Sequence, residues 1–445
     1  MSAPRIGDRI SLNYGAEITV KNRIGDGGQG IVYLVEKSDG QQYALKWYKK
    51  SYLNGLDKKH EEGKKFFKTN LITIIDKKAP NEKFLWPEEL TEEINGCFGY
   101  IMKLRPNEYK DFSDILVSSD KNGNPVVFKR FRAVVESALN IVYGFRTLHA
   151  KGFFYLDLND GNFFINTNSG DVLICDNDNV SAKPKYNLGK PGYIAPELVR
   201  GEAGVMSTAL TDYHSLAVVL FKLFIRHDPF MGAKYHGSVM VTAEKERDLY
   251  GNNPVFIFDP NDKNNRPVLN VDPNPIKFWP IYPQYIKDAF IRTFCDGIKT
   301  PTRRLADIEW AKLILRLSDD IISCPCGTDI IWSDYTNPPI CPKCKTNLGN
   351  PHYIELDNFR INLFPGNKIF TTHLDDDFEN RKVYATVVVN AKNPSVKGLK
   401  NMSNDIWNVK KPTGESIIIQ KDGILAILTD TEIEFPENKR IVIKN

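Results

Sequence analysis

A short hairpin pattern in the first half of the chain is flanked by three oxygen-bearing side chains. Asp157 and Asn162 stand five residues apart in the sequence YLDLNDGN, and Asp176 follows fourteen residues after Asn162. Two short apolar runs, 163–165 and 172–175, lie between them and are separated by the turn residues Thr-Asn-Ser-Gly. This pattern predicts a tight hairpin that brings Asp176 back beside Asn162.

These three side chains suit a site for phosphoryl transfer. Magnesium in such sites is held by few protein oxygens together with the phosphates of the substrate. Asn162 and Asp176 offer the oxygens for the metal, and Asp157 is left free to handle a substrate hydroxyl. The pattern therefore predicts Mg²⁺ at Asn162 and Asp176 and a catalytic role for Asp157.

A glycine-rich segment and a lysine precede this hairpin. The first hundred residues predict three strands, at 18–24, 31–36 and 42–48. Gly25, Gly27 and Gly30 lie between the first two strands, where bare backbone N–H groups can cradle phosphates. A Rossmann site needs a helix directly after the glycines, and here a strand follows. The residues alone leave two questions open. The glycines either cradle a phosphate or form only a flexible turn, and Lys46 in the third strand points to one face of the sheet or to the other.

The motifs of the chain occur in an order that resembles the eukaryotic-type (Hanks-type) protein kinase domain, over residues 15 to about 318. Further motifs of the set are Ala195-Pro196-Glu197, Asp212 and Arg304. The joint match is far more specific than any one motif. The resemblance implies an α+β, two-lobed protein kinase-like fold with ATP between the lobes. It also implies a serine/threonine protein kinase that transfers the ATP γ-phosphate to a protein hydroxyl with Mg²⁺.

The resemblance assigns roles to individual residues. The residues implied to bind ATP are Gly25, Gly27, Gly30, Val32, Ala44, Lys46, Met102, Leu104, Asn162 and Asp176. Lys46 is expected to hold the α- and β-phosphates, and Asp157 to orient the substrate hydroxyl. The hinge between the lobes is expected at 102–104, with Met102 lining the adenine pocket. Glu197 and Arg304 are expected to form an ion pair, and Asp212 to brace the catalytic loop.

The chain departs from the family at several motif positions. Tyr155-Leu156 replaces the usual His-Arg, Asn159 replaces a lysine, and Asp176-Asn177-Asp178 replaces Asp-Phe-Gly. These departures favour an alternative function, a catalytically weak pseudokinase scaffold that binds nucleotide. A kinase of small molecules with the same fold is a third possibility, which the Ala195-Pro196-Glu197 motif and Arg304 disfavour.

One expected partner is missing from the sequence. Protein kinases pair the strand lysine with a helix glutamate, and spacing places the equivalent position near Asn70. Glu61 and Glu62 lie one to two turns earlier in the predicted helix 58–75. Either this helix is displaced, or Lys46 is held by something weaker.

Four cysteines form a cluster after the kinase-like region. They are Cys324, Cys326, Cys341 and Cys344. Two close pairs at this spacing predict a tetrahedral structural zinc site in a zinc ribbon, although the first pair is C-x-C rather than C-x-x-C. A redox motif and unrelated buried cysteines are the alternatives.

The remaining sequence predicts a small all-β sandwich that faintly resembles a forkhead-associated domain. The predicted domains are 1–104 (N-lobe), 105–322 (C-lobe, with helices at 131–149, 212–225 and 310–322), 323–349 (zinc ribbon) and 350–445 (sandwich). The architecture resembles the kinase of a bacterial phosphorylation triad associated with tellurite resistance. That resemblance implies a von Willebrand A-type protein as substrate and a metal-dependent serine/threonine phosphatase as antagonist.

Composition limits the environment of the chain. The net charge of +4 over 445 residues gives no reason to expect nucleic acid as a partner. No run of about 18 apolar residues occurs, so we expect no membrane span. The N-terminus lacks the apolar core of a signal peptide, and seven cysteines are an odd number for a disulfide scaffold. We therefore expect a cytoplasmic protein.

Overall fold

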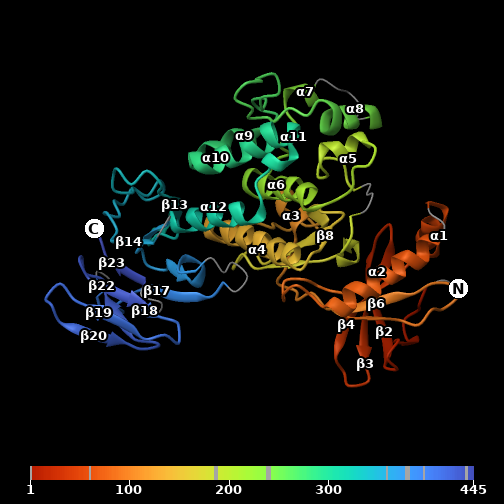
Figure 1. Ribbon diagram of the computed structural model, residues 1–445, viewed down its shortest axis with the longest axis horizontal. Helices are drawn as coiled ribbons and strands as arrows, with labels where there is room; N and C mark the ends of the chain where they lie inside the picture. Colours follow the sequence, from red (N-terminus) through yellow and green to blue (C-terminus); the bar gives the residue numbers. More distant parts are fainter. Residues whose placement is uncertain are drawn as a thin grey trace.

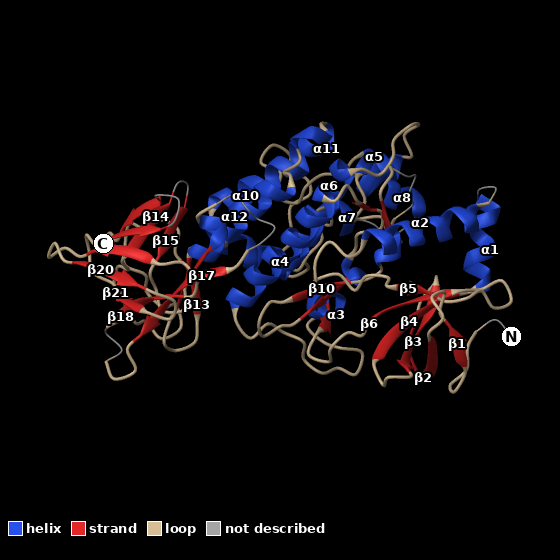
Figure 2. Cartoon of the chain, turned by 60° about the horizontal axis from the view of Figure 1, so that its bottom comes forward, coloured by secondary structure: helices blue, strands red, loops and turns tan. Residues whose placement is uncertain are grey.

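The computed structural model describes residues 3–59, 62–184, 189–236, 242–356, 359–375, 381–393, 396–435 and 439–445. Strand-rich parts lie at both ends of the molecule and a helical part lies between them (Figures 1 and 2). Among the helices in these ranges, none is long and apolar enough to cross a lipid bilayer.

The N-terminal part is an antiparallel sheet of six strands in the order β1-β2-β3-β4-β6-β5. The strands are β1 (Arg9–Ser11), β2 (Glu17–Asp26), β3 (Gly30–Lys37), β4 (Gln42–Tyr48), β5 (Glu89–Leu90) and β6 (Gly99–Lys103). The three strands predicted from the sequence are β2, β3 and β4. Their β-branched and aromatic residues pack well on a pleated surface, which explains why the sequence pattern was informative here.

The helix predicted at 58–75 is wrong in its bounds. The chain forms α1 (Lys50–Lys59) and then α2 (Gly63–Lys77). Glu62 before α2 has a left-handed backbone, with φ of 58°. A Cβ on Gly63 would lie 2.2 Å from the carbonyl oxygen of Leu56, so only glycine permits this close turn between the helices.

The central part is mainly helical. Its helices are α3 (Phe112–Val117), α4 (Phe131–Ala150), α5 (Pro196–Arg200), α6 (Ala209–Ile225), α7 (Ala233–His236), α8 (Ala243–Arg247), α9 (Pro273–Phe278), α10 (Gln284–Ile291), α11 (Gly297–Lys299) and α12 (Asp307–Asp319). Short strands accompany them: β7 (Lys110–Asp111), β8 (Phe154–Tyr155), β9 (Phe163–Ile165), β10 (Val172–Ile174) and β11 (Val180–Ser181). Helix α4 packs against both α6 and α12, and buried apolar side chains of these helices fill the core. The predicted helices at 131–149 and 212–225 are therefore present.

The helix predicted at 310–322 ends earlier than expected. Helix α12 stops at Asp319, and β12 (Ile321–Ser323) pairs with β13 (Asp329–Ile331). Ile321 and Ile322 are both fully buried, one in the central core and the other in a small core around Trp332. Consecutive side chains of a strand point to opposite faces, which allows both isoleucines to be buried in this way.

The C-terminal part is built from strands. The strands are β14 (Tyr353–Leu356), β15 (Phe359–Asn362), β16 (Lys368–Phe370), β17 (Val383–Val389), β18 (Lys397–Asn401), β19 (Trp407–Lys410), β20 (Ser416–Ile419), β21 (Ile424–Ala426), β22 (Glu432–Phe435) and β23 (Lys439–Val442). Two four-stranded sheets have the orders β16-β17-β18-β21 and β20-β19-β22-β23. Both contribute to a separate apolar core around Trp407.

Polar contacts join the C-terminal part to the helical part. The pairs are Arg132 with Asn367 at 2.8 Å, His373 with Asp319 at 3.1 Å, and Arg381 with Glu136. They connect α4 and α12 to the segments around β16 and β17. We call this set of three pairs the polar seam.

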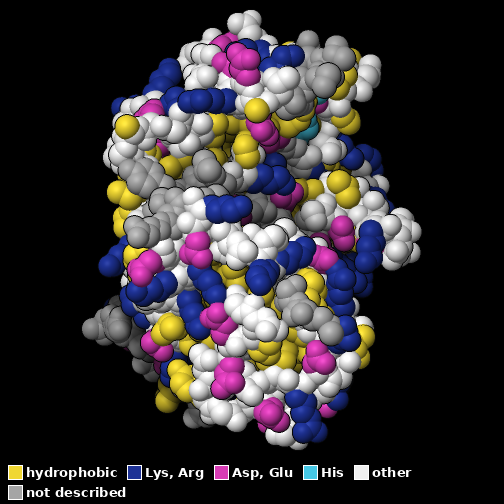
Figure 3. All heavy atoms as spheres, turned by 90° about the vertical axis from the view of Figure 1, so that its right-hand side faces the viewer, with side chains coloured by type: hydrophobic (Ala, Val, Ile, Leu, Met, Phe, Trp, Pro, Cys, Tyr) yellow, Lys and Arg dark blue, Asp and Glu magenta, His cyan; other side chains and the backbone are white. Residues whose placement is uncertain are grey.

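Charged side chains of both signs are interspersed on the face of the molecule drawn in Figure 3, which lies at the end of the N-terminal sheet. This mixture agrees with the small net charge of the whole chain.

Candidate active site

The predicted hairpin is formed by β9 and β10. Val172 pairs with Ile165, and the backbone N–H of Cys175 donates to the carbonyl of Asn162 at 2.9 Å. Asn162 and Asp176 are therefore brought together at the open end of the hairpin. Asp176 has a left-handed backbone with φ of 54°, and its side chain is 44% exposed. An exposed carboxylate beside an amide oxygen is a suitable pair of ligands for Mg²⁺.

Asp157 lies five residues before Asn162 and is partly buried. The Asn159 side chain donates to Asp157 Oδ1 at 3.3 Å, and the Lys190 backbone also hydrogen-bonds the Asp157 carboxylate. Burial raises the pKa of Asp157, and these hydrogen bonds oppose the rise. Asn159 thus occupies the place of the family's lysine but contacts Asp157 as a neutral donor.

The glycine loop joins β2 to β3. The backbone N–H of Gly27 donates to the carbonyl of Gly30 at 2.9 Å, which closes the turn. A Cβ on Gly30 would lie 2.5 Å from the carbonyl oxygen of Trp47, so this glycine allows β3 to approach β4. Gly25 and Gly27 meet no such obstacle. An added Cβ would meet only ordinary van der Waals contacts there, with the Val32 side chain at 3.5 Å from Gly25 and the carbonyl oxygen of Gly30 at 3.9 Å from Gly27.

The apolar residues assigned to ATP share one face of the N-terminal sheet. Val32 in β3 is the cross-strand partner of Lys46. Met102 in β6 is the partner of Ala44. Since Ala44 and Lys46 are two residues apart in β4, all four side chains project from the same face. Leu104 follows β6 directly and is partly buried against the same core.

Lys46 connects the glycine loop to the hairpin. Its Nζ donates to Gln29 Oε1 at 3.0 Å, to Asp176 Oδ1 at 3.1 Å and to the Asp178 carboxylate at 2.9 Å. Burial alone would lower the pKa of Lys46, but the carboxylates of Asp178 and Asp176 outweigh this effect and raise it. Lys46 is therefore a buried, charged ammonium beside the predicted metal ligands.

The sequence did not identify Asp178 as the partner of Lys46. The predicted helix position, Asn70, instead donates to the carbonyl of Val180 at 2.8 Å. Glu61 lies outside the described residues, and Glu62 pairs with Lys65. The signal in the sequence was that two departures from the family occur together. The helix lacks its glutamate, and the glycine of the Asp-Phe-Gly motif is replaced by an aspartate, Asp178.

Asp212 braces the catalytic loop, as the sequence predicted. Its Oδ2 accepts from the backbone N–H of Tyr155 at 2.7 Å and lies 3.1 Å from His149 Nε2. The other ring nitrogen of His149 lies 2.7 Å from Asp307 Oδ2. Burial lowers the pKa of His149, but the hydrogen bonds to both carboxylates outweigh it and raise the pKa to about 9.

This histidine predicts a pH dependence of stability. Because the folded pKa of about 9 lies above the unfolded value of 6.5, the stabilisation by His149 is complete below about pH 6.5 and is lost as the pH rises through 9. The shift corresponds to about 3 kcal/mol. Urea unfolding of the wild type and of His149→Asn at about pH 6 and about pH 9.5 measures it. The stability difference between the two proteins should shrink at the higher pH, and a constant difference contradicts the assignment.

The predicted ion pair between Glu197 and Arg304 is present and buried. Arg304 donates to both carboxylate oxygens of Glu197, at 2.8 and 2.7 Å. It also donates to the carbonyls of Gly297 and Leu210, each at 2.9 Å. These contacts tie the start of α5 to α6 and to the segment before α12.

The four clustered cysteines converge on one point. Their sulfur atoms all lie within 4.8 Å of one another, with Cys324 to Cys344 at 3.5 Å and Cys326 to Cys341 at 3.6 Å. Four thiolates bound to zinc at 2.3 Å in a tetrahedron would stand about 3.8 Å apart. The cluster is therefore compatible with a zinc ion.

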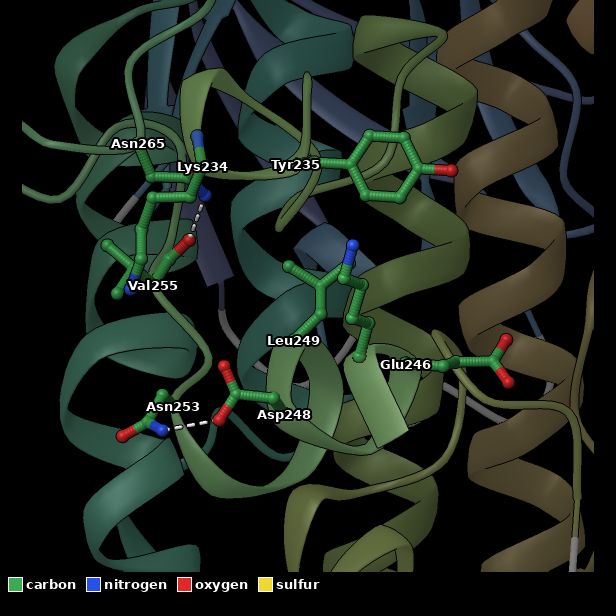
Figure 4. Close-up of a pocket in the computed structure, with 9 residues that line it drawn as sticks. Lys234, Tyr235, Glu246, Asp248, Leu249, Asn253, Val255 and Asn265 are labelled. Carbon is green, nitrogen blue, oxygen red and sulfur yellow. Dashed lines mark hydrogen bonds between the residues drawn. The ribbon is translucent and has the colours of Figure 1, made fainter. Parts of the chain in front are cut away.

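A pocket in the helical part, drawn in Figure 4, is a separate feature. Lys234, Asp248 and Asn253 are among its lining residues, and the Asn253 side chain donates to Asp248. Its volume is about 100 Å³. Sites for drug-sized ligands usually have about 300–1,000 Å³, so this pocket is not a nucleotide site.

Comparison with known proteins agrees with this geometry. The family model "Protein kinase domain" matches residues 18–255, which include the glycine loop, Lys46, Asp157, Asn162 and Asp176. Beta-adrenergic receptor kinase 1 of Mesocricetus auratus is 29% identical over 223 residues, which cover 48% of this chain and 29% of that protein. Rhodopsin kinase GRK1 of Rattus norvegicus is 34% identical over 111 residues, 23% of this chain and 18% of that protein.

A plant protein, the probable serine/threonine-protein kinase CCRP1 of Zea mays, is 30% identical over 99 residues, 21% of this chain and 15% of that protein. The chain thus spans less than a third of the length of these curated relatives. The family model nevertheless covers more than half of the 445 residues. The chain therefore belongs to the protein kinase domain family.

Proposed function

We propose that this chain is a serine/threonine protein kinase that transfers the γ-phosphate of ATP to a protein hydroxyl. The observation that carries the proposal is the position of Lys46 between the glycine loop and the hairpin. Its Nζ lies 3.0 Å from Gln29 Oε1 and 3.1 Å from Asp176 Oδ1. A triphosphate under the glycine loop would meet this ammonium, with the predicted metal ligands next to it.

Each part of the site has one task in this proposal. Lys46 and the N–H groups of the glycine loop bind the phosphates, while the apolar face with Ala44 and Met102 receives the adenine. Asn162 and Asp176 would hold Mg²⁺, which supplies positive charge to offset that of the phosphates. Asp157 orients the substrate hydroxyl, and the hydrogen bond from Asn159 fixes the direction of its carboxylate.

The test is transfer of labelled phosphate from ATP in the presence of Mg²⁺. The native protein should label a protein substrate, and both Asp157→Ala and Asp176→Ala should not. A native protein that binds ATP and labels no more than the two variants would support the pseudokinase scaffold instead. A candidate von Willebrand A-type protein belongs among the substrates offered.

We also propose that the cysteine cluster forms a structural zinc ribbon over residues 323–349. The purified protein should contain about one zinc per chain, because four thiolates form a closed tetrahedral site. Metal analysis of the double variant Cys324→Ser, Cys341→Ser should find none. The control is Cys295→Ser, which removes a thiol outside the cluster and should still bind zinc. Wild-type protein without zinc would exclude the ribbon.

The remaining assignments extend the proposal to the whole chain. The proposed lobes are 1–104 and 105–322, and the proposed forkhead-associated-like sandwich is 350–445. We also propose that the chain belongs to the tellurite-resistance-associated triad, with a metal-dependent phosphatase as antagonist. The paired four-stranded sheets support the sandwich. We also propose a cytoplasmic location, because seven cysteines are an odd number for a disulfide scaffold. Titration with a phosphothreonine peptide tests whether the sandwich binds phosphate.

A further inference from the structure

Lys46 has a buried counter-ion in the segment that follows the metal-binding aspartate. Its Nζ lies 2.9 Å from the carboxylate of Asp178, and the two side chains are only 6% and 0% exposed. By contrast, the Asp176 side chain is 44% exposed. Asp178 is thus the buried partner of Lys46, and Asp176 is the partner that solvent reaches.

Helix α2 does not supply this counter-ion. Its single acidic residue is Asp76, close to its C-terminal end. Asn70, at the position where the family has its glutamate, donates to the backbone carbonyl of Val180 at 2.8 Å. The helix therefore contacts the segment after Asp178 but leaves Lys46 to the aspartate.

Two tyrosines of the sheet complete the environment of Asp178. Tyr48 in β4 donates to Asp178 Oδ2 at 2.7 Å, and Tyr100 in β6 donates to Oδ1 at 3.3 Å. Both hydroxyls are buried, and burial raises the pKa of both tyrosines well above its ordinary value. They remain hydrogen-bond donors, so the buried carboxylate is satisfied by an ammonium and two hydroxyls.

We propose that Asp178 is the positioning residue of Lys46 and takes the part that a helix glutamate has in other protein kinases. This inference rests on the proposed kinase function. Because Asp176 and Asp178 come from one short segment, the metal ligand and the anchor of the phosphate-binding lysine are fixed together. Lys46 is then oriented by the sheet and this segment, whatever the position of α2.

In an alternative role, Asp178 would hold Lys46 away from the phosphates of ATP. The contacts of Lys46 argue against this role. An ammonium has three donors, and one of them points to Gln29 in the glycine loop. Gln29 is partly exposed. An ATP phosphate can replace this neutral partner while Asp178 keeps its own contact with the lysine.

The experiment compares Asp178→Asn and Asp178→Gly with the double variant Asp178→Gly, Asn70→Glu, which restores the arrangement of the family. Asp178→Asn should lower kcat about 100-fold and leave the KM for ATP within about threefold, because a misplaced lysine impairs the transition state more than binding. The double variant should recover kcat by at least about tenfold over Asp178→Gly, since its glutamate would offer Lys46 a carboxylate from the position where the family has one.

Controls separate this role from a merely structural one. Thermal unfolding gives the folded fraction of each variant, and Tyr48→Phe provides a milder change that should lower kcat in the same direction without unfolding the protein. Glu36→Gln removes an exposed partner of Lys21 in the same sheet and should leave kcat unchanged. Three outcomes would overturn the inference: a higher kcat in Asp178→Asn, a loss of kcat that only follows the folded fraction, or no recovery of kcat in the double variant. Inactivity of the wild type would instead refute the kinase function on which the inference rests.

Discussion

Asp157→Asn should lower the rate of phosphoryl transfer by about 10²–10⁴-fold, the usual contribution of a group that handles a proton in the transition state. Asparagine keeps the size of the side chain and can still accept the hydrogen bond from Asn159, which now reaches Asp157 Oδ1 at 3.3 Å. It lacks the negative charge that, in the proposed function, orients the substrate hydroxyl and accepts its proton. Because none of the ATP-binding roles falls to Asp157, the KM for ATP should stay within about threefold.

Initial rates with labelled ATP measure this effect. A suitable control is Asp171→Asn at the other end of the β9–β10 hairpin, where the carboxylate pairs with Lys83 and accepts a hydrogen bond from Tyr109. This variant loses a similar charge from the same hairpin but should keep most of its activity. Equal losses in the two variants would mean that the hairpin matters only as a structural element and that Asp157 has no specific role.

Arg304→Met should destabilise the protein by about 3–5 kcal/mol, the range found when one partner of a buried ion pair is removed. The Arg304 side chain is fully buried, and its guanidinium donates to Glu197 at 2.8 and 2.7 Å. Methionine fills a similar volume but leaves the Glu197 carboxylate buried without its partner. The carbonyls of Gly297 and Leu210 also lose their donor.

Urea unfolding of the wild type and the variant gives the difference in the free energy of unfolding. Arg303→Met is the matched control, because Arg303 pairs with Asp296 at 3.2 Å with both side chains more than half exposed. Exposed pairs contribute about 0–1 kcal/mol, so this control should stay close to the wild type. If Arg304→Met cost no more than the control, Glu197 would have to find another partner in the folded protein.

The parts of the fold that were predicted from the sequence are those specified by local pattern. The β9–β10 hairpin, for example, follows from two apolar runs around a turn, and its closure places Asn162 beside Asp176. The break between α1 and α2 was missed because it depends on a contact of Gly63 with Leu56 that no helical periodicity reveals. In the same way, α12 ends early because Ile321 and Ile322 are buried in two different cores.

The partner of Lys46 shows the same limit within the candidate site. The resemblance placed Asp176 in one site with Lys46 although they are 130 residues apart, but it gave no role to Asp178, because the family has a glycine at that position. The sequence also offered the carboxylates of Glu61 and Glu62 as candidate partners of Lys46. The buried anion at this position depends on the fold of the sheet, which brings Lys46, Tyr48 and Tyr100 together around the Asp178 carboxylate.

The polar seam has a consequence for how the molecule comes apart. Asp319 and His373 are almost fully buried where α12 meets the C-terminal strands, and Arg132 spans from α4 to Asn367. Separating the two parts would break these hydrogen bonds and would expose Phe370 of β16, which belongs to the apolar core of the helical part. We therefore expect the C-terminal strands and the helical part to melt in one cooperative transition, with no intermediate in which the C-terminal strands alone stay folded.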